Sequence, residues 1–257
     1  MRKLLICSDG DTASVNIRDA LIASGGWEDD GNLLYREDMI MMTIPGMHIH
    51  AENIDVKCGI EEVIFLSKHK SASGIPTFTV HPIGNFRDAD LGGKPRTLVR
   101  SSPRTMSALL RSLSSMNTGD FQVSFEVTHH GPWMDVPSTF IEIGSDEVQW
   151  NSKEAAGTVA DAVLDHNEND EISVIGIGGG HYAPRFTEAA IGHGINFGHM
   201  IPEYAFRDTD EEELIRIIRD SAENSETKLV YVHANKETTK RIANAVASCG
   251  LEIIDKM

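Results

Sequence analysis

The sequence predicts an α/β fold in which a mixed, largely parallel central sheet is flanked by helices. Short apolar runs of strand length alternate along the chain with longer segments of helical spacing, and this order is typical of parallel sheets covered by helices. The sequence shows no internal repeats or low-complexity tracts. We therefore expect one domain over residues 1–257, with only a weak boundary at the acidic loop 167–171.

In the first half of the chain, the apolar run 3–7 predicts a buried strand. Apolar residues then recur at helical spacing over 14–24, and this helix is expected to end at the glycines that follow. Pro103 favours the first turn of a helix that continues to Leu113. The remaining strands of this half are expected at 39–44, 63–66, 77–80, 121–128 and 139–143.

In the second half, Ser152 and Glu154 are typical of a helix start, and this helix is expected to continue to about His166. Residues 211–222 begin acidic and become basic, which suits the dipole of a second helix. A last helix is expected over 236–248, closed by Gly250. The strands of this half are expected at 171–177, 229–233 and 251–254.

The composition excludes several classes of protein. Hydrophobic residues make up 40% of the chain, which is too many for a disordered protein. No stretch approaches the roughly 20 apolar residues of a membrane span, and the N-terminal apolar run is too short for a signal peptide. Cys7, Cys58 and Cys249 are too widely spaced for a disulfide framework or a thiolate zinc site. We expect a cytoplasmic protein, plausibly a monomer, with its cysteines in the core.

The charge is unevenly distributed. The chain carries a net charge of −16, which by itself disfavours nucleic-acid binding. Residues 64–119, however, contain eight lysines and arginines against two aspartates, a net of +6 that leaves −22 for the rest. Such asymmetry can direct an anionic ligand to one region, although a chance cluster of solvated charges would have the same composition.

Most of the histidines fall in four segments that also contain glycine. Glycine allows close backbone approach to a ligand, while histidine transfers protons near neutral pH or binds metals. A single histidine is more often structural than catalytic, but four such segments favour a functional site. The segments are His69 in SKHKS with His81 in TVHPIGNF, His129 and His130 in EVTHHGP, His181 in GGGHYAPR, and His193 and His199 in GHGINFGHM.

Other nucleotide and hydrolase motifs are missing or incomplete. The glycines before His181 match G-x-G-x-x-A after a strand, but no following strand ends in a ribose-binding carboxylate. A Walker loop, an H-E-x-x-H zinc helix and a G-x-S-x-G nucleophile elbow are all absent from the sequence.

In this order, the motifs S-K-H-x-S, T-V-H-P-x-G-N, E-V-T-H-H-G-P, G-G-G-H-Y-A-P-R and G-H-M resemble those of the archaeal and plant D-aminoacyl-tRNA deacylases. They span residues 67 to 200, and the flanking elements extend the resemblance over the whole chain. The resemblance implies hydrolysis of the ester in D-aminoacyl-tRNA, with D-tyrosyl-tRNA as the usual example. It also implies Zn²⁺ as cofactor and a fold related to nucleoside phosphorylases and peptidyl-tRNA hydrolase.

Two mechanisms for ester hydrolysis remain open. In the first, zinc activates water and polarises the carbonyl. In the second, His130 or His181 acts as the base and the backbone N–H groups around Gly179 and Gly180 hold the oxyanion. The resemblance favours the first mechanism. Its candidate ligands are His81, His130, His181 and His199, with Glu126 or Asp135 completing the shell.

The implied partner is the aminoacylated acceptor end of tRNA, and no membrane partner is expected. Trp133, Met134 and Tyr182 are candidates for the apolar wall of an amino-acid pocket, although each could equally belong to the core. Another hydrolase or phosphorylase-like enzyme on the same fold, for example one like peptidyl-tRNA hydrolase, and a non-catalytic RNA-binding module remain alternatives. The candidate phosphate contacts are Lys68, Lys70, Arg100, Arg104 and Arg185.

Overall fold

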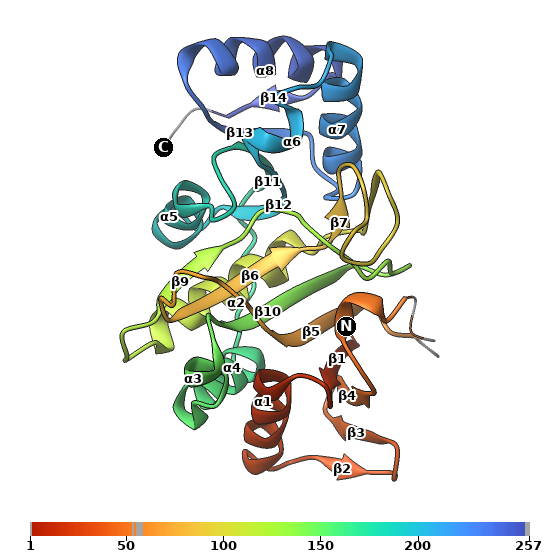
Figure 1. Cartoon of the computed structure of the whole chain (residues 1–257), viewed down its shortest axis with the longest axis vertical. Helices are drawn as coiled ribbons and strands as arrows, with labels where there is room; N and C mark the ends of the chain where they lie inside the picture. The colour runs from red at the N-terminus through yellow and green to blue at the C-terminus, as the bar shows by residue number, and fades with distance from the viewer. Residues whose placement is uncertain (1, 53, 55–58, 255–257) are drawn as a thin grey trace.

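The strands form one large and one smaller sheet (Figure 1). A computed structural model describes residues 2–52, 54 and 59–254. In the eight-stranded sheet, the pairs β4–β1, β1–β5, β5–β10 and β6–β9 are parallel. The pairs β10–β6, β2–β3 and β3–β4 are antiparallel. The strands lie in the order β2 (Glu28–Asp29), β3 (Leu33–Arg36), β4 (Met39–Ile44), β1 (Lys3–Ser8), β5 (Glu62–Lys68), β10 (Ser138–Gly144), β6 (Thr77–Pro82) and β9 (Gln122–Phe125).

The second sheet has four strands, all paired in parallel. Its order is β12 (Asn196–Ile201), β11 (Ser173–Gly178), β13 (Leu229–His233) and β14 (Glu252–Ile253). Two short strands, β7 (Gly84–Asn85) and β8 (Thr97–Leu98), form an antiparallel pair, and β7 follows directly after β6 in the chain. The predicted mixed, largely parallel α/β class is therefore confirmed, while the finer likeness to phosphorylases and peptidyl-tRNA hydrolase stays a prediction.

Helices cover both sheets. The helices α1, α2 and α4 pack against one face of the large sheet. The helices α7 and α8 cover the small sheet, at the top of Figure 1. The longer helices are α1 (Thr12–Ala23), α2 (Pro103–Met116), α4 (Lys153–Leu164), α5 (Pro184–His193), α7 (Glu211–Glu223) and α8 (Lys236–Ser248). The short ones are α3 (Glu147–Trp150), α6 (Glu203–Phe206) and the 3-10 turn His48–His50. No helix in the described part of the chain is long and apolar enough to cross a membrane.

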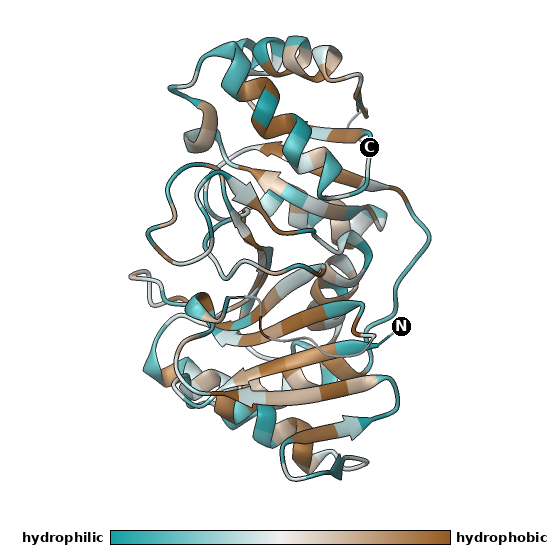
Figure 2. Ribbon diagram, turned by 90° about the vertical axis from the view of Figure 1, so that its right-hand side faces the viewer, coloured by the Kyte–Doolittle hydropathy of each residue, from teal (hydrophilic) through white to brown (hydrophobic). Residues whose placement is uncertain are grey.

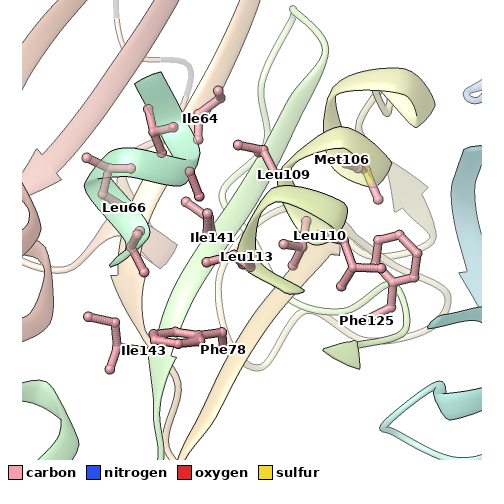
Figure 3. Close-up of a cluster of buried hydrophobic side chains, with 14 of the residues drawn as sticks. Ile64, Leu66, Phe78, Met106, Leu109, Leu110, Leu113, Phe125, Ile141 and Ile143 are labelled. Carbon is pink, nitrogen blue, oxygen red and sulfur yellow. The ribbon is translucent and has the colours of Figure 1, made fainter. Parts of the chain in front are cut away.

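The main core lies between α2 and the large sheet (Figure 3). Met106, Leu109, Leu110 and Leu113 of α2 face Ile64, Leu66, Phe78, Ile141, Ile143 and Phe125 of the strands. The same cluster of buried residues also includes Val174 and Phe197 of the small sheet, so the two sheets share a core. The prediction of a single domain stays a prediction. Figure 2 shows that the strands of both sheets are largely hydrophobic.

Several predicted elements shift at their ends. The strand expected at 121–128 ends at Phe125, because the backbone beyond it pairs with the segment before α5 instead. Asp11 caps α1, so this helix begins at Thr12. The β2–β3 hairpin, α5 and β12 are not among the elements predicted from the sequence. Cys7 is buried and Cys249 is partly buried, whereas Cys58 lies outside the described residues.

Candidate active site

The strand alternation that builds the core also gives the sheet a polar face. On β10, Ile141 and Ile143 face α2, so Phe140 and Glu142 face the other way. The antiparallel register pairs Phe140 with His81 and Glu142 with Thr79 on β6. All of these side chains are buried. One sheet face is therefore apolar and packed, while the other collects buried ionisable groups.

Glu126 is the centre of this polar face. It follows β9, its backbone N–H donates to the Val80 carbonyl at 3.1 Å, and its side chain is fully buried. One carboxylate oxygen lies 2.9 Å from His69 Nδ1. The other lies 3.4 Å from His129 Nε2 and 3.3 Å from His181 Nε2. Three imidazoles thus surround one buried carboxylate.

Glu142 is the second carboxylate of the site. Its Oε2 lies 3.6 Å from His81 Nε2 and 3.7 Å from His69 Nδ1, and it accepts a hydrogen bond from the Thr79 hydroxyl. On its other side, His69 Nε2 lies 2.8 Å from the hydroxyl of Tyr182. A continuous polar chain therefore extends from His81 through Glu142 and His69 to Tyr182.

His129 and His130 are held by backbone geometry. His130 has a positive φ of 43°, and its Nδ1 lies 2.6 Å from the Gly131 carbonyl. The rings of His129 and His130 lie 4.4 Å apart, centre to centre, and that of His81 is 4.2 Å from His129. Because His129 Nδ1 also contacts the Val127 carbonyl at 2.7 Å, its Nε2 remains for Glu126.

The surroundings shift the acidities of these groups. Burial alone would raise the pKa of Glu126, but the imidazoles of His181 and His69 hold this pKa well below its usual range. Burial lowers the pKa of His130 to about 4, and burial together with His81 and His130 holds the pKa of His129 well below its ordinary value. At neutral pH, Glu126 is therefore ionised, and His129 and His130 are neutral.

The glycine-rich segment before His181 favours glycine at two positions. Gly178 has a φ of 117°, and a Cβ there would lie 2.0 Å from the His233 carbonyl oxygen. Gly179 has a φ of 76°, which favours glycine, but at Gly179 and Gly180 a Cβ would meet nothing within 4 Å. The backbone beside His181 is thus open, with room for a ligand to approach the peptide N–H groups.

Three overlapping groups in the described residues could hold a metal ion. Each brings its ligand atoms within 4.8 Å of one another. His81 Nε2 and both oxygens of Glu126 are buried and make no well-directed hydrogen bond among the described residues, although other side chains of the cluster lie 2.9–3.6 Å from them. Orphaned acceptors in such a place suit a cation. The groups are His81–His129–His130, Glu126–His129–His181 and His69–Glu126–Glu142.

Of the predicted metal ligands, the structure brings together His81, His130, His181 and Glu126, but not His199. His199 lies within β12, where it is fully buried. Its Nδ1 lies 3.0 Å from the Thr128 hydroxyl and its Nε2 2.9 Å from the Val99 carbonyl. Both ring nitrogens are therefore engaged, and the ligand assignment of His199 is corrected to a structural one. Asp135 is exposed on a loop and is in none of the three groups.

The structural role of His199 has a measurable consequence. Burial lowers its pKa from 6.5 to about 4, so between these values the unfolded chain binds a proton that the folded chain does not. The free energy of unfolding must therefore fall as the pH falls from 6.5 towards 4. We expect His199→Gln, which cannot titrate, to remove about 3 kcal/mol of this dependence. Urea unfolding at a series of pH values measures it, and equal slopes for the two proteins would contradict the assignment.

The five predicted basic residues do not lie together. Lys68 and Lys70 flank His69 at the carboxyl end of β5, and Arg185 lies in the first turn of α5. Arg104 pairs with Asp170. Its neighbour Thr105 accepts a hydrogen bond from Lys3, the first residue of β1, so Arg104 lies at the opposite end of the sheet. The Arg100 guanidinium donates to the Asp135 carbonyl oxygen. The Arg100 carbonyl accepts a hydrogen bond from the backbone N–H of Ser138, so Arg100 lies at the amino end of β10.

Three residues of the cluster were given no role in the sequence-based prediction, namely His69, His129 and Glu142. Tyr182 was expected only as part of the apolar wall of an amino-acid pocket, whereas its hydroxyl also contacts His69. His69 and His129 lie inside the quoted motifs, so the signal was available but not assigned. Glu142 lies in the predicted strand 139–143, but only the structure shows that the strand face that carries it is buried.

Comparison with known proteins identifies the family of the chain. The family model described as D-aminoacyl-tRNA deacylase matches residues 56–254. The chain belongs to this family. Deacylase relatives include proteins named D-aminoacyl-tRNA deacylase from Thermococcus kodakarensis, 36% identical over 98% of this chain and 99% of that protein, and from Archaeoglobus fulgidus, 35% identical over 98% and 95%. The family is one of enzymes.

A solved structure has the same fold. It is described as a conserved protein of unknown function, and it is 34% identical to this chain. The two superpose with a TM-score of 0.86 over 98% of this chain and 94% of the other. The fold of this chain has therefore been observed by crystallography in a similar protein.

Proposed function

We propose that the chain hydrolyses the ester bond that joins a D-amino acid, D-tyrosine among them, to the 3′ end of tRNA. The relatives named D-aminoacyl-tRNA deacylase support this reaction. The observation that carries the proposal is the buried carboxylate of Glu126 with three imidazoles around it. Among those three, the side chain of His181 is 40% exposed, so it is the member that can meet a substrate.

The proposed site includes a Zn²⁺ ion. Imidazole nitrogens and a carboxylate oxygen are ligands that zinc prefers, and a catalytic site keeps one position open. The group Glu126–His129–His181 fits best, because it includes the exposed His181 while the orphaned Glu126 oxygens need a cation. When bound, zinc would lower the pKa of a water molecule to about 7 and polarise the ester carbonyl.

The remaining residues of the site would position the imidazoles and stabilise the charge that develops on the ester carbonyl. Tyr182 would fix the His69 ring through Nε2, while Nδ1 of that ring lies 2.9 Å from Glu126 and 3.7 Å from Glu142. The open backbone at Gly179 and Gly180 offers N–H donors to the oxyanion that develops when water adds to the carbonyl. Collapse of that intermediate breaks the ester C–O bond and releases the amino acid and the tRNA hydroxyl.

The acceptor end of tRNA would approach over the exposed side of His181. Lys68 and Lys70 flank His69 in sequence, and Arg185 lies in the first turn of the helix that follows His181, which supports their position on this side of the molecule. We propose these three as the phosphate contacts. Arg104 binds Asp170 at the other end of the sheet and is a weaker candidate.

The reaction is tested by the release of free tyrosine from D-tyrosyl-tRNA and L-tyrosyl-tRNA. We expect release from the D-ester in excess over the buffer control, and little from the L-ester. The purified full chain at nanomolar concentration suffices for the assay. Failure to release tyrosine from the D-ester, with or without added zinc, would reject the proposed function.

A further inference from the structure

A pocket of about 560 Å³ lies along the edge strand β9, beside the cluster around Glu126. The strand residues of its lining, which we call the floor, are Thr77 of β6 and Gln122, Val123 and Ser124 of β9. Ser73 and Ile75, which precede β6, also line it. The rest of the lining comes from Tyr182 and from Pro184, Thr187 and Glu188 of α5. Its size is within the range of pockets that hold small organic groups.

The floor of the pocket continues the polar face of the sheet. Thr77 pairs with Gln122 and Thr79 with Ser124, in parallel register. Because alternate residues of a strand share a face, Gln122 and Ser124 lie on the same face as Glu126. At about 3.3 Å per residue, Ser124 is roughly 7 Å from Glu126 along the chain, and Gln122 is about twice as far. The distance to Ser124, but not that to Gln122, is comparable with the reach of a large amino-acid side chain from its own carbonyl group.

Tyr182 is the wall that the pocket and the cluster share. It lines the pocket, its hydroxyl contacts His69 Nε2 at 2.8 Å, and its backbone pairs with that of Glu126. Its ring centre lies 5.6 Å from that of His181. The pocket and the exposed histidine of the site therefore have Tyr182 as a common neighbour.

The lining shows what chemistry the pocket accepts. Ile75 is a large apolar side chain that is 43% exposed, and Val123 and Pro184 add further apolar surface. The polar groups are neutral hydroxyls and the amide of Gln122. The single charged residue of the lining is Glu188, which pairs with Arg185 at 2.7 Å and would repel a phosphate. The pocket suits an uncharged apolar or aromatic group better than a nucleotide.

We propose that this pocket receives the side chain of the aminoacyl group while its ester carbonyl lies at Glu126 and His181. The inference rests on the proposed function and adds the subsite that determines which amino acids are accepted. Because the pocket is large and has neutral polar groups, large aromatic side chains such as that of tyrosine fit it. Small side chains leave most of it unfilled.

Ser124→Leu tests the proposal by filling the floor of the pocket. We expect kcat/KM for D-tyrosyl-tRNA to fall by about tenfold or more relative to D-alanyl-tRNA, whose methyl group does not need the space. Ser115→Leu is the matched control, since Ser115 is exposed on α2 and does not line the pocket. It should leave the ratio of the two substrates unchanged.

Ile75→Ala provides a second variant that is safe for folding, because this side chain is already partly exposed. We expect KM for D-tyrosyl-tRNA to rise about fivefold, with little change for D-alanyl-tRNA. Equal losses for both substrates would overturn the proposal, since they would mean that the pocket holds the tRNA end instead. Unchanged ratios in both variants would overturn it as well. Wild-type activity on D-tyrosyl-tRNA in the same assay separates either outcome from a failure of the proposed function.

Discussion

Glu126→Gln should lower kcat for D-tyrosyl-tRNA hydrolysis by about 10³-fold while the chain remains folded. The substitution keeps the size of the side chain but removes the charge that His69, His129 and His181 share. It also replaces an orphaned oxygen by an amide N–H₂ group, which cannot bind a cation. Losses of 10²–10⁴ are usual for groups that activate or transfer protons, and Glu126 orients three such groups at once.

Single-turnover release of D-tyrosine measures this effect, and circular dichroism confirms the fold. Glu62→Gln is the matched control, because Glu62 is an equally buried carboxylate that binds Lys3 and Thr105 instead of the histidines. The control is expected to lose stability but to keep the single-turnover rate. Retention of more than a tenth of the wild-type rate by Glu126→Gln would show that Glu126 is not central to the reaction.

Removal of metal should have the second large effect. After exhaustive chelation we expect hydrolysis to fall at least about 100-fold and to return on addition of one equivalent of Zn²⁺. A readout independent of activity is the thermal midpoint. A ligand that binds only the folded chain stabilises it by about 2.7 kcal/mol at one hundred times its Kd, so zinc should raise the midpoint of the metal-free protein.

The Glu126→Gln protein is the control for this stabilisation, since it keeps the histidines but lacks the carboxylate ligand. Its thermal midpoint should respond less to zinc than that of the wild type. Full activity after chelation would contradict the zinc proposal alone. It would favour the metal-free reaction, in which His130 or His181 takes the proton from water and the backbone at Gly179 and Gly180 binds the oxyanion.

Local sequence patterns predicted most of the fold. Continuous apolar runs mark β1, β5 and β13, because these strands are buried on both faces. The division into two sheets could not be predicted in this way, because it depends on which strands pair. β12 was missed since its sequence, Asn196–Ile201, contains asparagine and glycine, which are weak strand formers; tertiary pairing with β11 decides its conformation.

The same limit explains what was missed in the site. The motifs supplied Glu126, His81, His130 and His181, which the fold does bring together. His199 looked equivalent in sequence, but only its surroundings show that Thr128 and Val99 engage both of its nitrogens. The pairing of Glu142 with Thr79 across β10 and β6 is a matter of register, and a one-residue shift would have turned the carboxylate into the core.

The most direct test of the account is a crystal structure of the protein with a 3′-D-tyrosylamino-adenosine, whose amide resists hydrolysis. We expect its carbonyl group to lie within hydrogen-bonding distance of the cluster formed by Glu126, His129 and His181. The phenol ring is then expected in the pocket beside Tyr182. An analogue bound elsewhere, with its carbonyl remote from Glu126, would contradict the assignment of this cluster as the active site.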